Sequence, residues 1–157
     1  MSNGNAFSIR PAGLDELEIA ADLRAAMASE MGNQWDRDYP GWRPRFAAYF
    51  RDKQRAGTCQ TFFAVRNEDG AVVGVAIFSF VDEYRATALG QLRAHVNSVF
   101  VVEPWRRRGV GRELMQAGLA WLRERGCVLV RLRASEAGRA LYASLGFVAG
   151  TEMERKL

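Results

Sequence analysis

Apolar residues recur along this chain with two different periods, and glycine or proline stands at most of the changes from one period to the other. Segments of helix-forming residues carry apolar side chains every three or four positions, which predicts helices with one buried side. Other segments alternate or are almost continuously apolar and are rich in β-branched and aromatic residues, which predicts strands. The predicted elements are a strand over 7–13, helices over 14–32 and 43–57, strands over 59–67, 71–83 and 95–103, a helix over 111–126, a strand over 127–135, a helix over 136–146 and a strand or hairpin over 147–157.

This order of elements predicts a mixed α/β fold built around one sheet. The strands over 59–67 and 71–83 are separated by a short turn with a glycine and are expected to form a hairpin. The segment 95–133 contains a strand, a helix and a second strand, so these two strands are expected to be adjacent and parallel. The chain has 157 residues and no linker, repeat or low-complexity tract, so we expect 1–157 to form a single domain.

Composition narrows the class of protein without indicating an activity. Hydrophobic residues make up 48% of the chain and charged residues 25%, as in ordinary globular domains. No apolar run approaches the roughly 20 residues of a membrane span, and the first residues do not resemble a secretory signal. Cys59 and Cys127 lack metal-ligand spacing and are expected to be buried free thiols. We therefore expect a cytoplasmic protein that binds neither a metal nor a membrane.

The charge of the chain leaves two classes of ligand open. The net charge is +4, which is compatible with nucleic-acid binding. Nearly all the basic residues are arginine, with lysine only at Lys53 and Lys156, and arginine is a good bidentate partner for phosphate. Because the excess of positive charge is modest and scattered, a compact phosphorylated ligand explains it as well as DNA does.

The sequence RRRGVG at 106–111 stands between a predicted strand and a predicted helix. The first backbone N–H groups of a helix are unpaired and lie at the positive end of its dipole, so this position favours an anion. Gly109 and Gly111 leave room for the oxygens of a pyrophosphate to approach the backbone. A dinucleotide-binding fingerprint would need a third glycine where Leu114 stands, and a P-loop would need Gly-Lys-Ser/Thr, which the chain lacks. A solvated turn with glycines is the alternative.

Two blocks of the sequence resemble the GNAT superfamily of N-acetyltransferases. VFVVEPWRRRGVGRELM is similar to the family's acyl-CoA motif, in which Arg/Gln-x-x-Gly-x-Gly/Ala opens a helix after an apolar strand, and Arg106, Gly109 and Gly111 fill the fixed positions. SEAGRALYASLGF resembles the later motif, in which a helix carries an alanine, then Leu-Tyr, and ends in Leu-Gly-Phe. The resemblance holds residue by residue over about 95–147. It implies a central mixed, mostly antiparallel sheet with a splayed parallel pair, flanked by about four helices.

The same resemblance implies that acetyl-CoA is the cosubstrate and that the backbone holds most of it. The strand over 99–101 would pair with the pantetheine amides, as an added strand does. Backbone N–H groups of the turn and of the next helix would hold the pyrophosphate, with Arg106 supporting the turn. Ser135 stands where many members carry asparagine, and Arg139 either reaches a CoA phosphate or is solvated. The cofactor-binding residues expected in this way are Val99, Phe100, Val101, Arg106, Arg107, Arg108, Gly109, Val110, Gly111, Arg112, Ser135 and Arg139.

Tyr142 and His95 are the candidate catalytic residues. Tyr142 occupies the Leu-Tyr position of the second block, and a phenol with a pKa of about 10 suits protonation of a leaving thiolate. His95 is the only histidine and matches the place where several family members carry a base; a neutral imidazole with a pKa of about 6.5 can take a proton from the attacking amine. The alternatives are a core tyrosine and a solvated histidine. Asp82 and Glu83 are substitutes for His95, and the N–H of Val101 is the candidate to stabilise the oxyanion.

The acceptor is expected to be a small-molecule or peptide amine. Its candidate binding wall is the end of the first helix, the following loop and the start of the second helix, because carboxylates attract an ammonium group and aromatic faces bind it by cation–π contact. An ordinary loop packed by its tryptophans is the alternative. The candidate acceptor residues are Glu30, Met31, Trp35, Asp36, Asp38, Tyr39 and Trp42 on this wall, and Asn97 on the strand face that carries His95.

Three functions are compatible with these observations. The first is an N-acetyltransferase that moves acetyl from acetyl-CoA to a primary amine by direct attack in a ternary complex, since neither motif contains a cysteine. The second is a non-catalytic acyl-CoA-binding or regulatory module of the same fold. The third, nucleic-acid binding, is disfavoured because the arginines gather at one turn without an accompanying stripe of aromatic and basic residues. The terminal segment over 147–157 is a candidate for a homodimer contact.

Overall fold

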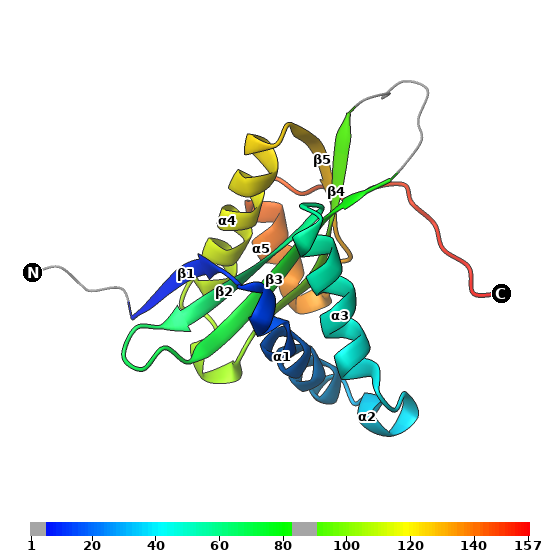
Figure 1. Ribbon diagram of the computed structural model, residues 1–157. Helices are drawn as coiled ribbons and strands as arrows, with labels where there is room; N and C mark the ends of the chain where they lie inside the picture. Colours follow the sequence, from blue (N-terminus) through cyan, green and yellow to red (C-terminus); the bar gives the residue numbers. More distant parts are fainter. Residues whose placement is uncertain (1–5, 83–90) are drawn as a thin grey trace, which may run out of the picture.

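The computed structural model describes residues 6–82 and 91–157, and in this part of the chain five strands form one sheet in sequence order (Figure 1). The elements are β1 (Phe7–Pro11), η1 (Leu14–Glu16), α1 (Leu17–Glu30), α2 (Trp35–Asp38), α3 (Trp42–Arg55), β2 (Cys59–Arg66), β3 (Val72–Val81), β4 (Leu92–Val101), η2 (Glu103–Trp105), α4 (Val110–Glu124), β5 (Cys127–Arg131), η3 (Glu136–Gly138) and α5 (Arg139–Ser144). Neighbours from β1 to β4 are antiparallel, whereas β4 and β5 are parallel. The predicted mixed, mostly antiparallel sheet is confirmed.

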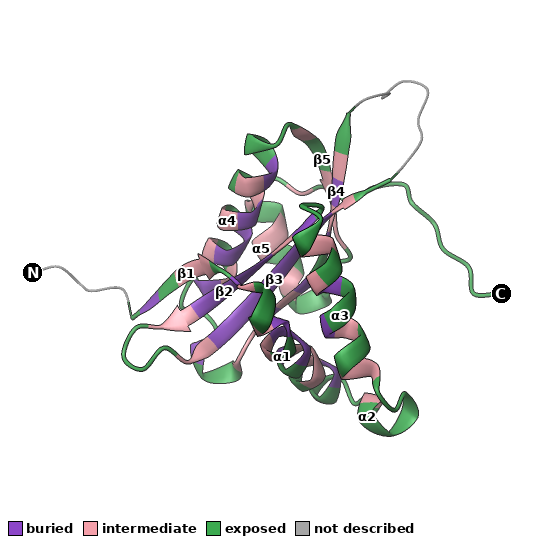
Figure 2. Cartoon of the chain, viewed as in Figure 1, coloured by how far each residue is buried: buried purple, intermediate pink, exposed green. Residues whose placement is uncertain are grey.

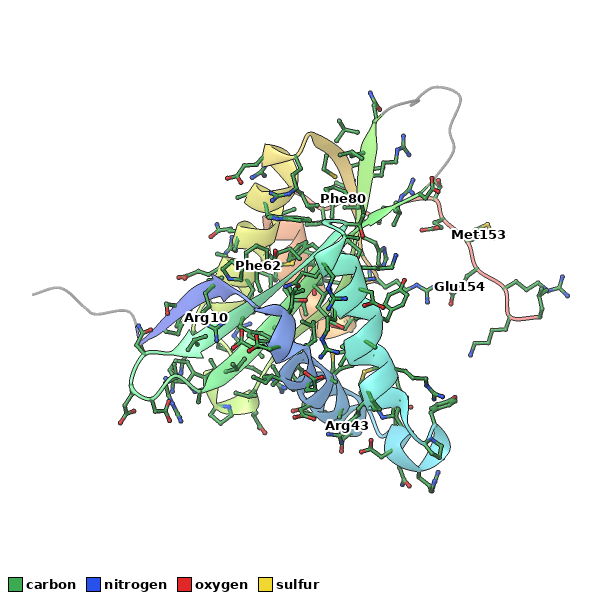
Figure 3. The ribbon with its side chains drawn as sticks, viewed as in Figure 1. Arg10, Arg43, Phe62, Phe80, Met153 and Glu154 are labelled. Atoms are coloured by element: carbon green, nitrogen blue, oxygen red, sulfur yellow. The ribbon has the colours of Figure 1, made fainter. Side chains whose placement is uncertain are left out.

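Helices cover both faces of the sheet, and strand alternation divides the core between them. Phe62 and Phe78 pack with apolar residues of α4 on one face of the sheet. Figure 3 shows Phe62 on the α4 side. Phe63 and Ile77 point to the opposite face and pack with apolar residues of α1 and α3. Because both faces of β2 and β3 are covered, these strands are buried along most of their length (Figure 2).

The distance between α4 and the sheet is set by a glycine. A Cβ at Gly118 would lie 2.0 Å from two ring atoms of Phe78. Further along the same helix, Trp121 stacks on Phe80 with 5.3 Å between the ring centroids. The small residue therefore lets the helix axis approach the sheet, and the stacked pair extends the contact toward the end of β3.

The predicted helix ends are close to the observed ones. Each of α1, α3, α4 and α5 ends two residues before the glycine that was expected to stop it, and each of these glycines has a positive φ: Gly32, Gly57, Gly126 and Gly146. Glycine adopts the left-handed conformation just beyond a helix more easily than other residues. The glycines in the sequence therefore predicted where these helices end.

The structure departs from the predicted elements in several places. The helical turn α2 forms inside the segment that was predicted as a loop, β4 begins at Leu92 instead of 95, and β5 ends at Arg131 instead of 135. The described segment over 147–157 contains no strand, so the predicted terminal strand or hairpin is wrong. This segment is largely exposed (Figure 2), because an alternating sequence forms a strand only where a sheet edge pairs with it.

The two cysteines differ in their surroundings. Cys59 is a buried free thiol, as predicted, whereas Cys127 at the start of β5 is only partly buried. Among the helices of residues 6–82 and 91–157, none combines the length and apolar character needed to cross a membrane.

Candidate active site

The parallel ladder between β4 and β5 ends in the middle of β4. Register pairs run from Leu92 opposite Cys127 to His95 opposite Arg131, whereas β4 continues to Val101. Beyond His95, the side of β4 that faces away from β3 has no strand partner among the described residues. The predicted splayed pair is therefore present, and we call the unpaired side of β4 after His95 the opening.

A bulge lies at the start of the opening. Phe78 stands opposite Val96 and Ile77 stands opposite Ser98, so Asn97 is the extra residue on β4. A bulge of this kind bends a strand and increases its twist. Asn97, which was predicted to contact the acceptor, is exposed at this bend.

Backbone alternation decides which groups face the opening. The N–H of Val102 donates to the carbonyl of Val73 on β3 at 2.9 Å. The backbone groups of successive strand residues point in opposite directions, so those of Phe100 face β3 and those of Val99 and Val101 face the opening. Of the three positions expected to pair with pantetheine, Val99 and Val101 are the two whose backbone groups face the opening, and the carbonyl of Val101 is already an acceptor for Arg106.

The turn that follows β4 leads into an uncapped helix. Arg107 has a φ of 62° and Gly109 a φ of 83°, so the chain turns sharply before α4 begins at Val110. No side chain of the described residues caps the N-terminus of the 15-residue helix α4, and apart from Gly109 and its two chain neighbours no described residue has an atom within 4 Å of a Cβ placed at Gly109. The first N–H groups of α4 are thus accessible at the positive end of the helix dipole, which fits an anionic group such as a pyrophosphate.

Arg106 ties the end of β4 to α1. Its Nε donates to the carbonyl of Val101 at 2.8 Å, and its Nη2 forms an ion pair with Glu30 at 2.6 Å. Its guanidinium also lies 5.4 Å from the ring centroid of Phe100. Arg106 thus contacts the strand end and the turn, and Glu30, which was expected to face the acceptor, is paired with Arg106.

The other arginines of the motif have different surroundings. Arg112 donates to the hydroxyl of Ser144 at 2.6 Å and so connects α4 to α5. Arg108 lies over the ring of Trp105 with 5.1 Å to its centroid, and Arg107 is exposed. Arg107 and Arg108 therefore leave their guanidinium groups at the surface beside the start of α4.

The ring of Tyr142 on α5 is held from two sides. The N–H of Phe147 donates to the carbonyl of Tyr142 at 3.0 Å and that of Gly146 to the carbonyl of Ala143 at 3.0 Å, which is the Schellman arrangement. This arrangement brings the rings of Phe147 and Tyr142 together, with 6.0 Å between their centroids. On the other side, a Cβ at Gly138 would lie 2.7 Å from the Tyr142 ring.

The helix that carries Tyr142 lies against the turn and the end of β4. A Cβ at Gly111 would lie 3.3 Å from Leu141 and 4.0 Å from Val101, so these three residues meet. Tyr142 itself is half-buried, and burial raises the pKa of its hydroxyl. The phenol therefore stays protonated at neutral pH beside the two segments expected to bind acetyl-CoA.

A cavity of about 620 Å³ lies where the parallel ladder ends. His95 lines this cavity and is half-buried; burial lowers its pKa most, and Arg133 and Arg131 lower it further, while Glu152 acts in the opposite direction. The imidazole is therefore neutral at neutral pH. The lining residues are Val81, Asp82, Ala94, His95, Arg131, Leu132, Arg133 and Glu152. Of the two predicted substitutes for His95, Asp82 lines the cavity and Glu83 lies outside the described residues.

Two further cofactor candidates have local partners. The hydroxyl of Ser135 accepts a hydrogen bond from the N–H of Gly138 at 3.1 Å and so caps η3. Arg139 forms an exposed ion pair with Glu136 at 3.1 Å. A contact of either side chain with CoA would have to share or replace these local interactions.

The predicted acceptor wall forms a second cavity, of about 260 Å³, which Trp35 and Trp42 line. Arg24 lies over the ring of Trp35 at 4.9 Å from its centroid. Asp36 accepts hydrogen bonds from Arg43 at 2.6 Å and from the indole of Trp42 at 3.0 Å. The cation–π contact and ion pair expected for an acceptor are thus made within the chain, and α2 lies at the end of the molecule opposite the β4–β5 ladder (Figure 1).

Sequence reasoning missed the charged residues that share the cavity with His95. Arg131, Arg133 and Glu152 come from the end of β5 and from the C-terminal segment. The alternation of arginine and leucine at 131–133 was a signal for two arginines on one side of a strand. No pattern in the sequence predicted that the C-terminal segment, with Glu152, lies beside this strand. In residues 6–82 and 91–157, no cluster of three or more His, Cys, Asp or Glu is arranged to hold a metal ion.

Comparison with known proteins gives concordant findings. A sequence model of the acetyltransferase (GNAT) family matches residues 28–147. A GCN5-related N-acetyltransferase from Ralstonia eutropha JMP134 superposes with a TM-score of 0.82 at 25% identity, covering 96% of this chain and 98% of its own. A predicted acetyltransferase with acetyl-CoA from Clostridium acetobutylicum gives a TM-score of 0.84 at 17% identity, with 96% of each chain covered. An aminoglycoside N-acetyltransferase in complex with CoA gives 0.71 at 23% identity, covering 100% of this chain and 95% of its own. No curated protein matches in sequence.

Proposed function

Because the chain belongs to the acetyltransferase (GNAT) family, we propose that it transfers an acetyl group from acetyl-CoA to a primary amine by direct attack within a ternary complex. The observation that carries the proposal is the early end of the β4–β5 ladder. The opening that results has His95 and its cavity at one end and the uncapped start of α4 at the other. A cosubstrate bound along the opening would present its thioester to an amine in the cavity.

The residues along the opening fit acetyl-CoA. The backbone groups of Val99 and the N–H of Val101 suit amides of an extended pantetheine, since they face the opening and have no strand partner there among the described residues. The accessible N–H groups at the start of α4, with Arg107 and Arg108 beside them, suit the pyrophosphate. When bound, acetyl-CoA supplies the acetyl thioester.

His95 is the proposed base. The amine must be neutral to attack, and a neutral imidazole accepts its proton directly or through a water molecule. Burial and the two nearby arginines lower the pKa of His95 and keep it in the accepting form. Since the pKa of His95 lies below its ordinary value, its basic form is available from mildly acidic pH upward.

A backbone N–H of β4 and Tyr142 are proposed to act on the other atoms of the reaction. The N–H groups of Val99 and Val101 both face the opening, and the one that lies beside the thioester can donate to the carbonyl oxygen as negative charge develops on it, while the other is left for a pantetheine amide. The hydroxyl of Tyr142, kept protonated by its raised pKa, can donate its proton to the sulfur as the carbon–sulfur bond breaks. Direct attack is favoured over a cysteine intermediate because Cys59 is buried in the core under α1 and α3, and Cys127 lies opposite Leu92, at the end of the β4–β5 ladder away from the opening.

Thiol release from acetyl-CoA in the presence of a panel of amines tests the proposal. We expect thiol to appear in proportion to an acetylated amine, detected by mass spectrometry. The alternative, a non-catalytic acyl-CoA-binding or regulatory module, predicts calorimetric binding of CoA without thiol release for any amine in the panel. Binding without turnover would replace the enzymatic proposal with this second function.

A further inference from the structure

The cavity beside His95 is lined by charges of both signs. Carboxylates come from Asp82, just after β3, and from Glu152 on the C-terminal segment, while guanidinium groups come from Arg131 and Arg133. With a neutral imidazole, the formal charges of this lining cancel. A cavity built for a purely cationic molecule is expected to be predominantly negative, because complementary potentials raise both the encounter rate and the specificity.

The positive charges of Arg131 and Arg133 affect the electrostatic potential at His95, where the amine has to react. Arg133 and Arg131 both lower the pKa of His95, so their field disfavours positive charge at the imidazole. The same field disfavours an acceptor whose every group is positive. An acceptor that places a negative group near the guanidiniums would offset this field and orient its amine away from them.

One arginine of the cavity already binds a carboxylate. Arg133 forms an ion pair with Glu154 of the C-terminal segment (Figure 3 shows Glu154 on this segment). The side chains of the pair are 81% and 66% exposed, so the interaction is weak and can be exchanged. Glu154 therefore makes the contact that a carboxylate or phosphate of a ligand would make with the same guanidinium.

We propose that the acceptor is an amine that also carries an anionic group, a carboxylate or a phosphate, which Arg131 and Arg133 bind while the amine faces His95. The inference rests on the proposed function and narrows its acceptor. The volume of about 620 Å³ suits a small molecule of this kind. Polyamines and aminoglycosides are excluded by the proposal, because their positive charges would meet the two guanidiniums.

The test compares acceptors that differ only in the anionic group, with thiol release from acetyl-CoA as the readout. α-Amino acids are compared with their amides, and phosphorylated amino sugars with the same sugars without phosphate. Spermidine and kanamycin serve as polycationic acceptors. We expect the anionic member of one series to have a kcat/KM about tenfold or more above that of its neutral partner, since a charge-assisted hydrogen bond contributes at least about a tenfold gain in affinity. The series that responds separates a carboxylate from a phosphate.

Variants connect this preference to the residues. At a pH where His95 is neutral in every variant, Arg131→Gln and Arg133→Gln are expected to raise the KM for the anionic acceptor about tenfold relative to the KM for its neutral partner. Glu154→Gln is expected to lower that KM, because the competing carboxylate is removed. Arg55→Gln, at the end of α3 and paired with Asp52, is the matched control and leaves the KM unchanged. Calorimetric binding of CoA confirms that each variant is folded.

The outcomes separate this inference from the function on which it rests. Acetylation of amines irrespective of an anionic group, or a preference for the polycations, would overturn the inference and leave the acetyltransferase in place. An anionic preference that survives both arginine substitutions would also overturn it. Absence of thiol release with every amine would remove the proposed function and the inference together.

Discussion

Two titratable side chains beside the opening have pKa values moved in opposite directions by their surroundings. Burial raises the pKa of Tyr142, whereas burial together with Arg133 and Arg131 lowers the pKa of His95. At neutral pH the first is therefore a proton donor and the second a proton acceptor. Groups whose environments separate their pKa values in this way are the ones best suited to divide acid and base tasks between them.

Substitution of Tyr142 tests the acid. We expect Tyr142→Phe to lower kcat at least tenfold with little change in the affinity for acetyl-CoA, because the ring keeps its packing and loses only the hydroxyl. Steady-state kinetics and calorimetry measure the two quantities. Tyr49→Phe, an exposed tyrosine on α3, is the control. An unchanged kcat in Tyr142→Phe would remove Tyr142 from the mechanism.

The pH dependence of kcat/KM tests the base. Since the pKa of His95 is lowered, activity is expected to rise with pH through a midpoint below about 6.5, the ordinary value, and to hold its level toward neutral pH. His95→Gln should abolish this rise of kcat/KM with pH. Both proteins are assayed with the same acceptor, so that protonation of the acceptor affects the two pH profiles equally. A rise that persists at the same pH in the variant would eliminate His95 as the base, and Asp82 would be the next residue to substitute.

At the residue scale, the sequence identified candidate positions that belong to a local motif and did not show contacts between residues far apart in the chain. Tyr142, His95 and Gly109 were identifiable because each holds a fixed place in a resemblance or in a turn. The pairing of Glu30 with Arg106 was not predictable, since the partners are 76 positions apart and join α1 to the turn before α4. Glu30 was expected to contact the acceptor for the same reason, since a sequence identifies an acidic residue but not the residue with which it forms an ion pair.

At the scale of elements, α4 packs closely on β3 through Gly118. A helix can approach a sheet this closely only where its facing residue is very small, and Gly118 is that residue. The N-terminus of α4 belongs to the proposed pyrophosphate site. The depth at which α4 sits on the sheet therefore also sets the position of the cofactor site.

Substitution of Gly118 tests this packing. We expect Gly118→Ala to reduce the free energy of unfolding by about 1–3 kcal/mol, the usual cost of overpacking, since its Cβ would lie 2.0 Å from the Phe78 ring. Urea unfolding followed by circular dichroism measures the change. Gly150→Ala is the matched control, because apart from Gly150 and its chain neighbours no described residue has an atom within 4 Å of a Cβ placed there. Equal stability of the two variants would contradict the packing argument.

Substitution of Gly138 tests whether the short segment before α5 positions Tyr142. A Cβ at Gly138 would displace the ring, so we expect Gly138→Ala to lower kcat while the affinity for acetyl-CoA is retained. In the Tyr142→Phe background the same substitution should have almost no further effect on kcat, because the hydroxyl that it displaces is absent. Full additivity of the two substitutions would show that Gly138 acts independently of Tyr142.

The elements that the sequence predicted well are those with local stop signals. Helix ends followed from glycines, and the parallel pair followed from a strand, helix and strand in succession. The terminal strand over 147–157 was wrong because pairing needs a free edge within reach, which is a property of the whole sheet. The helical turn α2 was missed because four residues are too few to show a period.

At the scale of the whole molecule, apolar surface gathers around the edge formed by β5. β5 is the last strand of the described sheet and has β4 as its neighbour there. Val128 is 56% exposed and Leu129 39%, and Met153 on the neighbouring C-terminal segment is 93% exposed. Exposed apolar side chains at an unpaired strand are typical of surfaces that associate.

Sedimentation equilibrium tests whether two copies associate, as the sequence analysis predicted for the terminal segment. We expect a reversible dimer, with Val128→Lys weakening the dimer at least tenfold because a charge enters the apolar edge. Leu14→Lys, a comparable exposed position in η1, is the control. A monomer at all concentrations of the unsubstituted protein would contradict the prediction.

The opening has a consequence for the lifetime of the protein in a crowded solution. The backbone groups of Val99 and the N–H of Val101, which have no strand partner at the opening among the described residues, can pair with an extended segment of another chain, because backbone pairing does not depend on sequence. A ligand that occupies these groups withdraws them from misassembly while it serves turnover. We expect the supply of acetyl-CoA to set both the rate of catalysis and the rate at which the enzyme is lost to aggregation.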